Sequence, residues 1–211
     1  RPIKLIPVLV NHMMFYRGAI ARLGMPAGHE AVRGGRADIV NHMDKRRIFM
    51  RGLVEPLLSA LVPFANEIEA IDIINEPELA VLEHGYNYFT ANEMIDFIRE
   101  VGASITRRNF RAVIGTTDPS SLQRWGLGGI ELHEHYYGAS TLGVQRPGAV
   151  LGEFGTVSTG RDRSVSQEYW HDLSVLSRLR VAERAGFSMA YVWSRHGNEG
   201  PTPDGYVWNT G

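Results

Sequence analysis

The sequence predicts an α/β fold, a (β/α)8 TIM barrel in which about six of the eight βα units, strands 3 to 8, are present. Three observations support this prediction. Apolar segments typical of strands alternate with amphipathic segments typical of helices, and this order favours a parallel sheet covered by helices. Several apolar segments stop at a polar residue, as barrel strands do at their active end. No internal repeat or linker is found, so residues 1–211 are predicted to form one partial barrel domain.

Six apolar or alternating segments are predicted to form the strands. They are residues 3–10, 68–75, 111–116, 129–137, 149–152 and 188–193. A complete barrel needs eight strands in typically about 250 residues. We therefore expect this chain to start at the third strand and to lack the natural amino terminus. An open doubly wound sheet is the rival topology, but no Gly-rich phosphate-binding turn follows an early strand.

The segment 129–137 has an unusual alternation of polar and apolar residues. Glu131, His133 and His135 fall on one face, whereas Ile130 and Leu132 fall on the other. We expect the polar set to project into the barrel and the apolar set to pack against the helices.

The first predicted helix begins at Asp44, which is a suitable N-cap residue. Its apolar residues recur at helical spacing and form one stripe that we expect to be buried: Phe49, Leu53, Leu57 and Leu61. Pro56 lies inside this helix and is expected to kink it.

Three further helices are predicted. Thr90 and Glu93 form a capping box for a helix with these inward residues: Met94, Ile95, Ile98, Val101 and Ile105. A brief helix follows Asp118. The last helix covers about residues 164–185 and is expected to end at Gly186.

Composition limits the functional classes that fit this chain. The 22 Lys and Arg residues nearly balance the 23 Asp and Glu residues, so neither nucleic acid nor an acidic membrane surface is an expected partner. Cysteine is absent, which excludes disulfides, thiolate nucleophiles and zinc sites with Cys ligands. No apolar stretch reaches the roughly 18 residues that a membrane span needs. A neutral polymer remains an acceptable partner.

Two predicted strands deliver a glutamate directly at their carboxyl ends. The strand 68–75 runs into Asn75, Glu76 and Pro77, and the strand 149–152 runs into Glu153. Polar residues at the carboxyl ends of barrel strands carry catalysis. A pair of carboxylates is the usual machinery of glycosidic bond cleavage. The sequence therefore predicts a glycosidase.

These motifs, in this order, resemble a retaining β-glycosidase of clan A, nearest to glycoside hydrolase family 5 of the cellulase and mannanase type. The resemblance covers nearly the whole chain. It implies that Glu76 of Asn-Glu-Pro is the general acid/base and that Glu153 of Gly-Glu-Phe-Gly is the nucleophile. The family's strand-two arginine has no counterpart here, so the chain by itself is not expected to hold the complete site.

The same resemblance implies a set of substrate-binding residues. His135 and Tyr137 match the family's His-x-Tyr motif, and Trp193 matches an aromatic residue that supports a sugar ring. Asn75 would bind the 2-hydroxyl group of the sugar. His12, at the end of the first strand, is a further candidate. The expected partner is a β-glucan, a mannan or a related glycoside; no cofactor and no metal ion are expected, and secretion or export to the periplasm is favoured.

Two alternatives stay open. His133 and His135 lie on one strand face and, with the glutamates, would suit a divalent metal ion in a barrel isomerase or hydrolase. A non-catalytic carbohydrate-binding barrel would keep the aromatic residues but would tolerate the loss of either glutamate.

Overall fold

The computed structural model describes residues 4–15, 36–81, 89–136, 148–154, 157–159, 179–192 and 206–208. The chain divides into two compact units. The first consists of Arg1–Arg17 and Arg33–Leu132, and the second of Gly18–Val32 and His133–Gly211. Whether both units belong to one domain, as the sequence predicts, stays a prediction.

The first unit contains two buried parallel strands, β1 (Ile71–Asn75) and β2 (Ala112–Thr116). Every residue of both strands is buried, as expected for strands in a parallel sheet covered by helices. The predicted strand boundaries 68–75 and 111–116 are therefore correct to within three residues.

The predicted strand at residues 3–10 differs from the expectation. Residues 5–11 run parallel to β1, but they form isolated bridges with it and no continuous ladder. Pro7 accepts a hydrogen bond from the Asp72 N–H and has no N–H of its own to give to the ladder. Leu5 and Val8 are 54% and 52% exposed, so this apolar run is half uncovered and not buried as its composition indicated.

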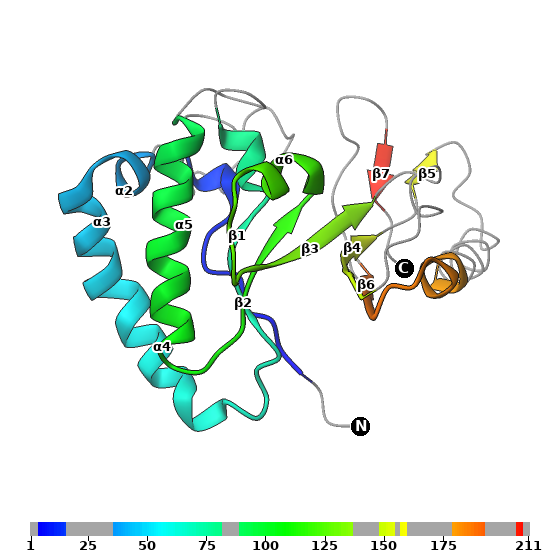
Figure 1. Ribbon diagram of the computed structural model, residues 1–211, viewed down its shortest axis with the longest axis horizontal. Helices are drawn as coiled ribbons and strands as arrows, with labels where there is room; N and C mark the ends of the chain where they lie inside the picture. The colour runs from blue at the N-terminus through cyan, green and yellow to red at the C-terminus, as the bar shows by residue number, and fades with distance from the viewer. Residues whose placement is uncertain are drawn as a thin grey trace. The chain divides into compact units, whose positions relative to one another are not determined.

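A long helical segment packs beside α5 (Ala91–Thr106) in the first unit (Figure 1). It consists of α3 (Met43–Phe49), the π turn η2 (Met50–Val54) and α4 (Glu55–Leu61), preceded by α2 (Asp38–Asn41) and followed by η3 (Val62–Phe64). The prediction that Asp44 caps this helix is wrong: the N-cap is His42, and Asp44 lies in the first turn.

The predicted buried stripe of this segment is also wrong. The buried residues are Met50, Val54 and Leu58, whereas Leu53 is 49% exposed. Met50, Val54 and Leu58 have the same spacing of four as the expected stripe but lie one residue further along the chain, so two adjacent apolar stripes were available and the spacing alone did not decide between them. The π turn η2 does not change that spacing. Pro56 lies next to this turn, and its missing N–H removes a hydrogen bond to the preceding turn.

Helix α5 confirms the predicted capping box. Thr90 N–H donates to Glu93 Oε2 over 2.8 Å, and Glu93 N–H donates to Thr90 Oγ1 over 3.3 Å. The predicted inward residues are buried except Ile95, which is half-buried. At Gly102 a Cβ atom would lie 2.9 Å from the Ile130 side chain, so the helix approaches the sheet closely there. Ile130 therefore packs against α5, as expected.

An ion-paired cluster ties together the amino ends of the strands. Arg111, just before β2, pairs with Glu69 over 2.5 Å and with Glu131 at the start of β3 (Glu131–Tyr136). In a parallel barrel the amino ends contribute to stability, and the carboxyl ends carry the chemistry. The Glu131 carboxylate is held by this arginine, and its projection into a barrel interior stays a prediction.

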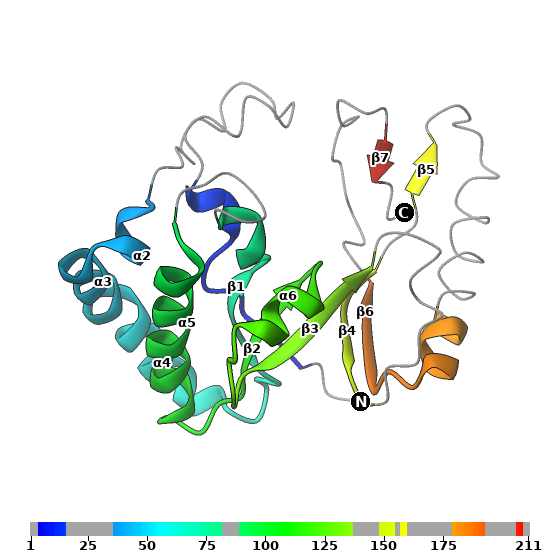
Figure 2. The same ribbon diagram turned by 45° about the horizontal axis from the view of Figure 1, so that its top comes forward.

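In the second unit β4 (Val150–Phe154) pairs in parallel with β3 and with β6 (Met189–Val192) (Figure 2). The order of the strands in the sheet is β1-β2-β3-β4-β6. Residues 179–185 are helical, and Gly186 follows with a φ of 89°, so this helix ends where the sequence predicts. The predicted start of that helix lies outside the described residues.

One described feature of the second unit was not expected. Strands β5 (Val157–Thr159) and β7 (Tyr206–Trp208) pair antiparallel in a separate two-stranded sheet. The short helix α6 (Pro119–Arg124) in the first unit does follow Asp118 as predicted. The described strands thus support the predicted parallel α/β class, and closure into a barrel stays a prediction.

Candidate active site at the end of strand β1

Strand β1 contains an extra residue just before its carboxyl end. Between two paired positions β1 advances three residues, from Asp72 to Asn75, while β2 advances two, from Val113 to Gly115. The Asp72 side chain accepts a hydrogen bond from the Ile74 N–H over 3.0 Å inside this irregularity. Such bulges redirect the side chains that follow them and are common beside active sites.

Glu76 follows this bulge in a left-handed backbone conformation, with φ 55° and ψ 54°. Its N–H donates to the Gly115 carbonyl over 2.8 Å, and the residue is only 8% exposed. A left-handed conformation costs a residue with a side chain about 1–2 kcal/mol. Such strain persists where the surrounding structure imposes it, and it concentrates at functional sites.

His12 lies beside Glu76. It opens the short helix η1 (His12–Phe15), and its Nδ1 is 3.5 Å from Glu76 Oε2 and 3.2 Å from the Asn75 carbonyl oxygen. A carbonyl oxygen only accepts, so this contact requires a proton on Nδ1. His12, Asn75 and Glu76 are all buried. The structure therefore brings three of the predicted site residues together in the first unit.

Glu78 is a buried carboxylate that the sequence reading did not single out. It lies in η4 (Pro77–Ala80) and is 1% exposed. Its Oε1 accepts hydrogen bonds from the Thr116 and Thr117 hydroxyls and from the Thr117 and Asp118 N–H groups, over 2.7 to 3.2 Å. The available signal was a second glutamate two residues after Glu76 in an otherwise apolar segment.

Strand β4 in the second unit has a similar extra residue, Gly152, directly before Glu153. β4 advances two residues, from Leu151 to Glu153, while β3 advances one. A Cβ atom on Gly152 would lie 2.6 Å from His133 Cβ and 3.2 Å from His135 Cδ2. Only glycine fits this close approach.

The other predicted site residues belong to the second unit or lie outside the described residues. His133 and His135 are buried, and the His133 ring stacks on Tyr191 with ring centroids 6.3 Å apart. The side chain of Glu153 and the whole of Tyr137 and Trp193 lie outside the described residues. Among the side chains that are described, no group of three or more His, Asp or Glu residues is arranged to hold a metal ion.

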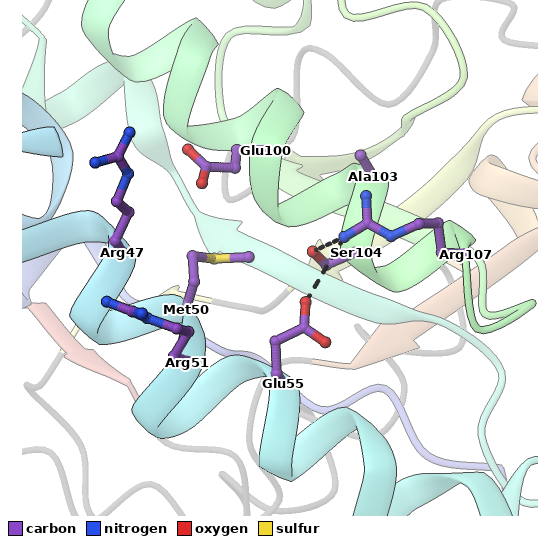
Figure 3. A pocket seen from close by; sticks show the side chains of 8 residues that line it. All are labelled: Arg47, Met50, Arg51, Glu55, Glu100, Ala103, Ser104 and Arg107. Atoms are coloured by element: carbon purple, nitrogen blue, oxygen red, sulfur yellow. Dashed lines mark hydrogen bonds and ion pairs between the residues drawn. The ribbon is translucent and has the colours of Figure 1, made fainter. Parts of the chain in front are cut away.

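A groove between the helices is a different kind of feature (Figure 3). Its lining residues are Arg47, Met50, Arg51, Glu55, Glu100, Ala103, Ser104 and Arg107. Burial alone would raise the pKa of Glu55, but hydrogen bonds from Ser104 and Arg108 and the charges of Arg108 and Arg107 together lower that pKa. The groove lies on the helices α3, α4 and α5, so it is an ion-paired helix interface and not part of the site at the strand ends.

No family model and no curated protein matches the chain. Two solved structures resemble it. The β-1,4-mannanase from the common sea hare Aplysia kurodai is 14% identical, with a TM-score of 0.58 over 93% of this chain and 65% of that enzyme. The β-mannanase from the blue mussel Mytilus edulis is 16% identical, with a TM-score of 0.57 over 90% of this chain and 62% of that enzyme.

These likenesses show a shared fold. The chain has the architecture of these mannanases over most of its own length but spans less than two thirds of theirs. This agrees with the predicted α/β fold class. None of the helices in the described part of the chain is both long enough and apolar enough to cross a membrane.

Proposed function

We propose that this chain is the catalytic part of a glycoside hydrolase that cleaves β-glycosidic bonds by a retaining mechanism. The observation that carries the proposal is Glu76, which is buried, strained and in contact with His12 at the carboxyl end of a parallel strand. Catalytic carboxylates occupy this place in barrel enzymes. The fold shared with two β-mannanases supports the same class of enzyme.

In this mechanism two glutamates have separate roles. Glu76 protonates the oxygen of the leaving sugar while Glu153 attacks the anomeric carbon, and a covalent glycosyl-enzyme forms. Glu76 then accepts a proton from the water that releases the sugar. Retention requires the two carboxyl groups about 5 to 5.5 Å apart, whereas inversion needs about 6.5 to 9.5 Å. A crystal structure of the protein with a bound oligosaccharide would measure this distance.

The proposed substrate is a β-linked polysaccharide. Asn75 is proposed to bind a sugar hydroxyl beside Glu76, and the further proposed contacts are His12, His135, Tyr137 and Trp193. Because both similar structures are β-mannanases, β-mannan is the first polymer to try. β-Glucan and xylan are the natural comparisons in the same screen.

The test is a substitution at the proposed nucleophile. In a full-length parent protein Glu153→Ala should abolish release of reducing ends from the polymer, and azide should restore turnover of an activated aryl glycoside as a glycosyl azide of inverted configuration. Proton NMR of the product reports that configuration. Wild-type activity in the Glu153→Ala variant would refute the assignment, and loss of activity on chelation would point to a metal-dependent enzyme instead.

A further inference from the structure

We propose that Glu78 is a positioning residue that holds Glu76 in its catalytic orientation. This inference rests on the proposed role of Glu76 as the general acid/base. Glu78 does not touch the substrate in this proposal; it acts by fixing the turn in which Glu76 lies.

The contacts of Glu78 show how it fixes the turn. All four of its hydrogen bonds end on one oxygen, Oε1, and all come from the three consecutive residues 116–118 that follow strand β2. Burying a carboxylate costs free energy unless hydrogen bonds replace its hydration. Two backbone N–H groups and two hydroxyls fill that role at Oε1, whereas Oε2 is buried without a hydrogen-bond partner among the described residues. The carboxylate is therefore a fixed link between η4 and the loop after β2.

The segment between Glu76 and Glu78 is held at both ends. At one end the Glu76 N–H donates to the Gly115 carbonyl, and at the other Glu78 binds Thr116 and its two successors. Pro77 lies between them, and its ring fixes φ near −65°. A segment with so few free torsions has little choice of conformation. The two anchors thereby impose the left-handed conformation of Glu76, which its own preference disfavours.

A purely structural anchor would have the same contacts, so the test must separate the two roles. A misplaced acid matters only when the leaving group needs a proton. Phenol is a poor leaving group that needs protonation, whereas 2,4-dinitrophenolate departs without it. The kcat/KM value covers substrate binding and formation of the glycosyl-enzyme, and it does not depend on the later hydrolysis step. The ratio of the kcat/KM values for the two aryl glycosides therefore reports how well Glu76 protonates the leaving group. A general loss of folded protein lowers both values equally and leaves this ratio unchanged.

The experiment uses a full-length parent protein in its wild-type form and as the Glu78→Ala and Glu78→Asp variants. The substrates are phenyl and 2,4-dinitrophenyl β-mannobiosides. A displacement of about 1 Å can cost about 100-fold in rate, so Glu78→Ala should lower kcat/KM about 100-fold for the phenyl glycoside and less than about threefold for the dinitrophenyl glycoside. Glu78→Asp keeps the charge but is one methylene shorter, and it should give the same pattern at about 10-fold. If Glu78→Ala fails to fold, the Glu78→Asp variant alone tests the positioning role.

Glu93→Ala is the matched control. Like Glu78, Glu93 is a carboxylate of the first unit that accepts a backbone hydrogen bond, but it belongs to the capping box of α5 and not to the turn that contains Glu76. Glu93→Ala should lower the melting temperature and leave the ratio of the two kcat/KM values unchanged. Equal losses on both glycosides in the Glu78 variants, or no loss, would overturn the positioning role.

A crystal structure of Glu78→Asp gives a second readout that does not depend on activity. The φ of Glu76 should leave the left-handed region or its carboxylate should move, and an unchanged Glu76 would overturn the inference. If wild-type protein cleaves neither glycoside while Glu76 moves as expected, the proposed enzymatic function is what fails, and the mechanical link from Glu78 to Glu76 stands.

Discussion

The close approach at Gly152 gives the sharpest prediction for the second unit. In Gly152→Ala the new methyl carbon would lie 2.6 Å from His133 Cβ and 3.2 Å from the His133 backbone carbon. Neither atom can be moved by a side-chain rotation, so strand β4 or β3 must shift. Overpacking of this kind costs about 1–3 kcal/mol. For a domain of 150–250 residues 1 kcal/mol lowers Tm by about 2–4 °C, so Gly152→Ala should lower Tm by about 2–12 °C, and by about 4–8 °C at the middle of the range, about 2 kcal/mol.

The assay is thermal unfolding followed by circular dichroism and by intrinsic fluorescence. Gly128→Ala is the matched control, because no atom lies within 4 Å of its Cβ position and its φ is not left-handed. That control should melt within about 2 °C of wild type, since surface substitutions usually change stability by less than about 0.5 kcal/mol. A Gly152→Ala variant as stable as Gly128→Ala would show that strands β3 and β4 do not approach as closely as described. It would also contradict the bulge before Glu153.

Three other predictions concern the first unit. The pKa of Glu55 is lowered in the folded state from an ordinary value of 4.5. Its contribution to stability should therefore be present above pH 4.5 and be lost as the pH falls through the lowered pKa. In urea unfolding at a series of pH values, Glu55→Gln should make stability depend less on pH in this range, and the effect should be small because the side chain is 30% exposed. Thr90→Ala removes the N-cap of α5 and should cost about 1 kcal/mol in urea unfolding, whereas an unchanged midpoint would contradict the capping box. The exposed apolar residues Leu5 and Val8 lie on the segment 5–11, which is joined to its neighbour by isolated bridges only. We therefore expect the chain to self-associate through this segment. Leu5→Lys should shift its sedimentation coefficient toward that of a monomer.

The parts of the fold that the sequence predicted well depend on local signals. Alternating strand and helix patterns placed β1, β2 and β6 within three residues, and the Thr90 and Glu93 pair marked the start of α5 one residue before its first helical residue. Gly186 marked a helix end because glycine adopts a positive φ without strain. Each of these signals comes from a few adjacent residues, and tertiary contacts did not override them.

The parts that sequence reading missed depend on contacts between distant residues. In the helix 43–61 two apolar stripes of the same spacing lie side by side, and packing in the folded chain decides that Met50, Val54 and Leu58 are the buried one. The left-handed φ of Glu76 was not predictable because a glutamate gives no local signal for it. Glu78 was missed because its partners, Thr116 to Asp118, are about 40 residues away in the chain.

The two bulges explain why the site could be listed from the sequence but not assembled from it. In a regular strand the side chains alternate, so the face of a strand-end glutamate follows from counting back along the strand. One extra residue reverses that count. Strand β1 has its extra residue between Asp72 and Asn75, and β4 has its own at Gly152. Both fall just before the glutamates proposed for catalysis. Simple alternation therefore does not hold through either strand end, and the buried Asp72 carboxylate in β1 and the missing side chain at Gly152 in β4 are the features that accommodate the extra residue.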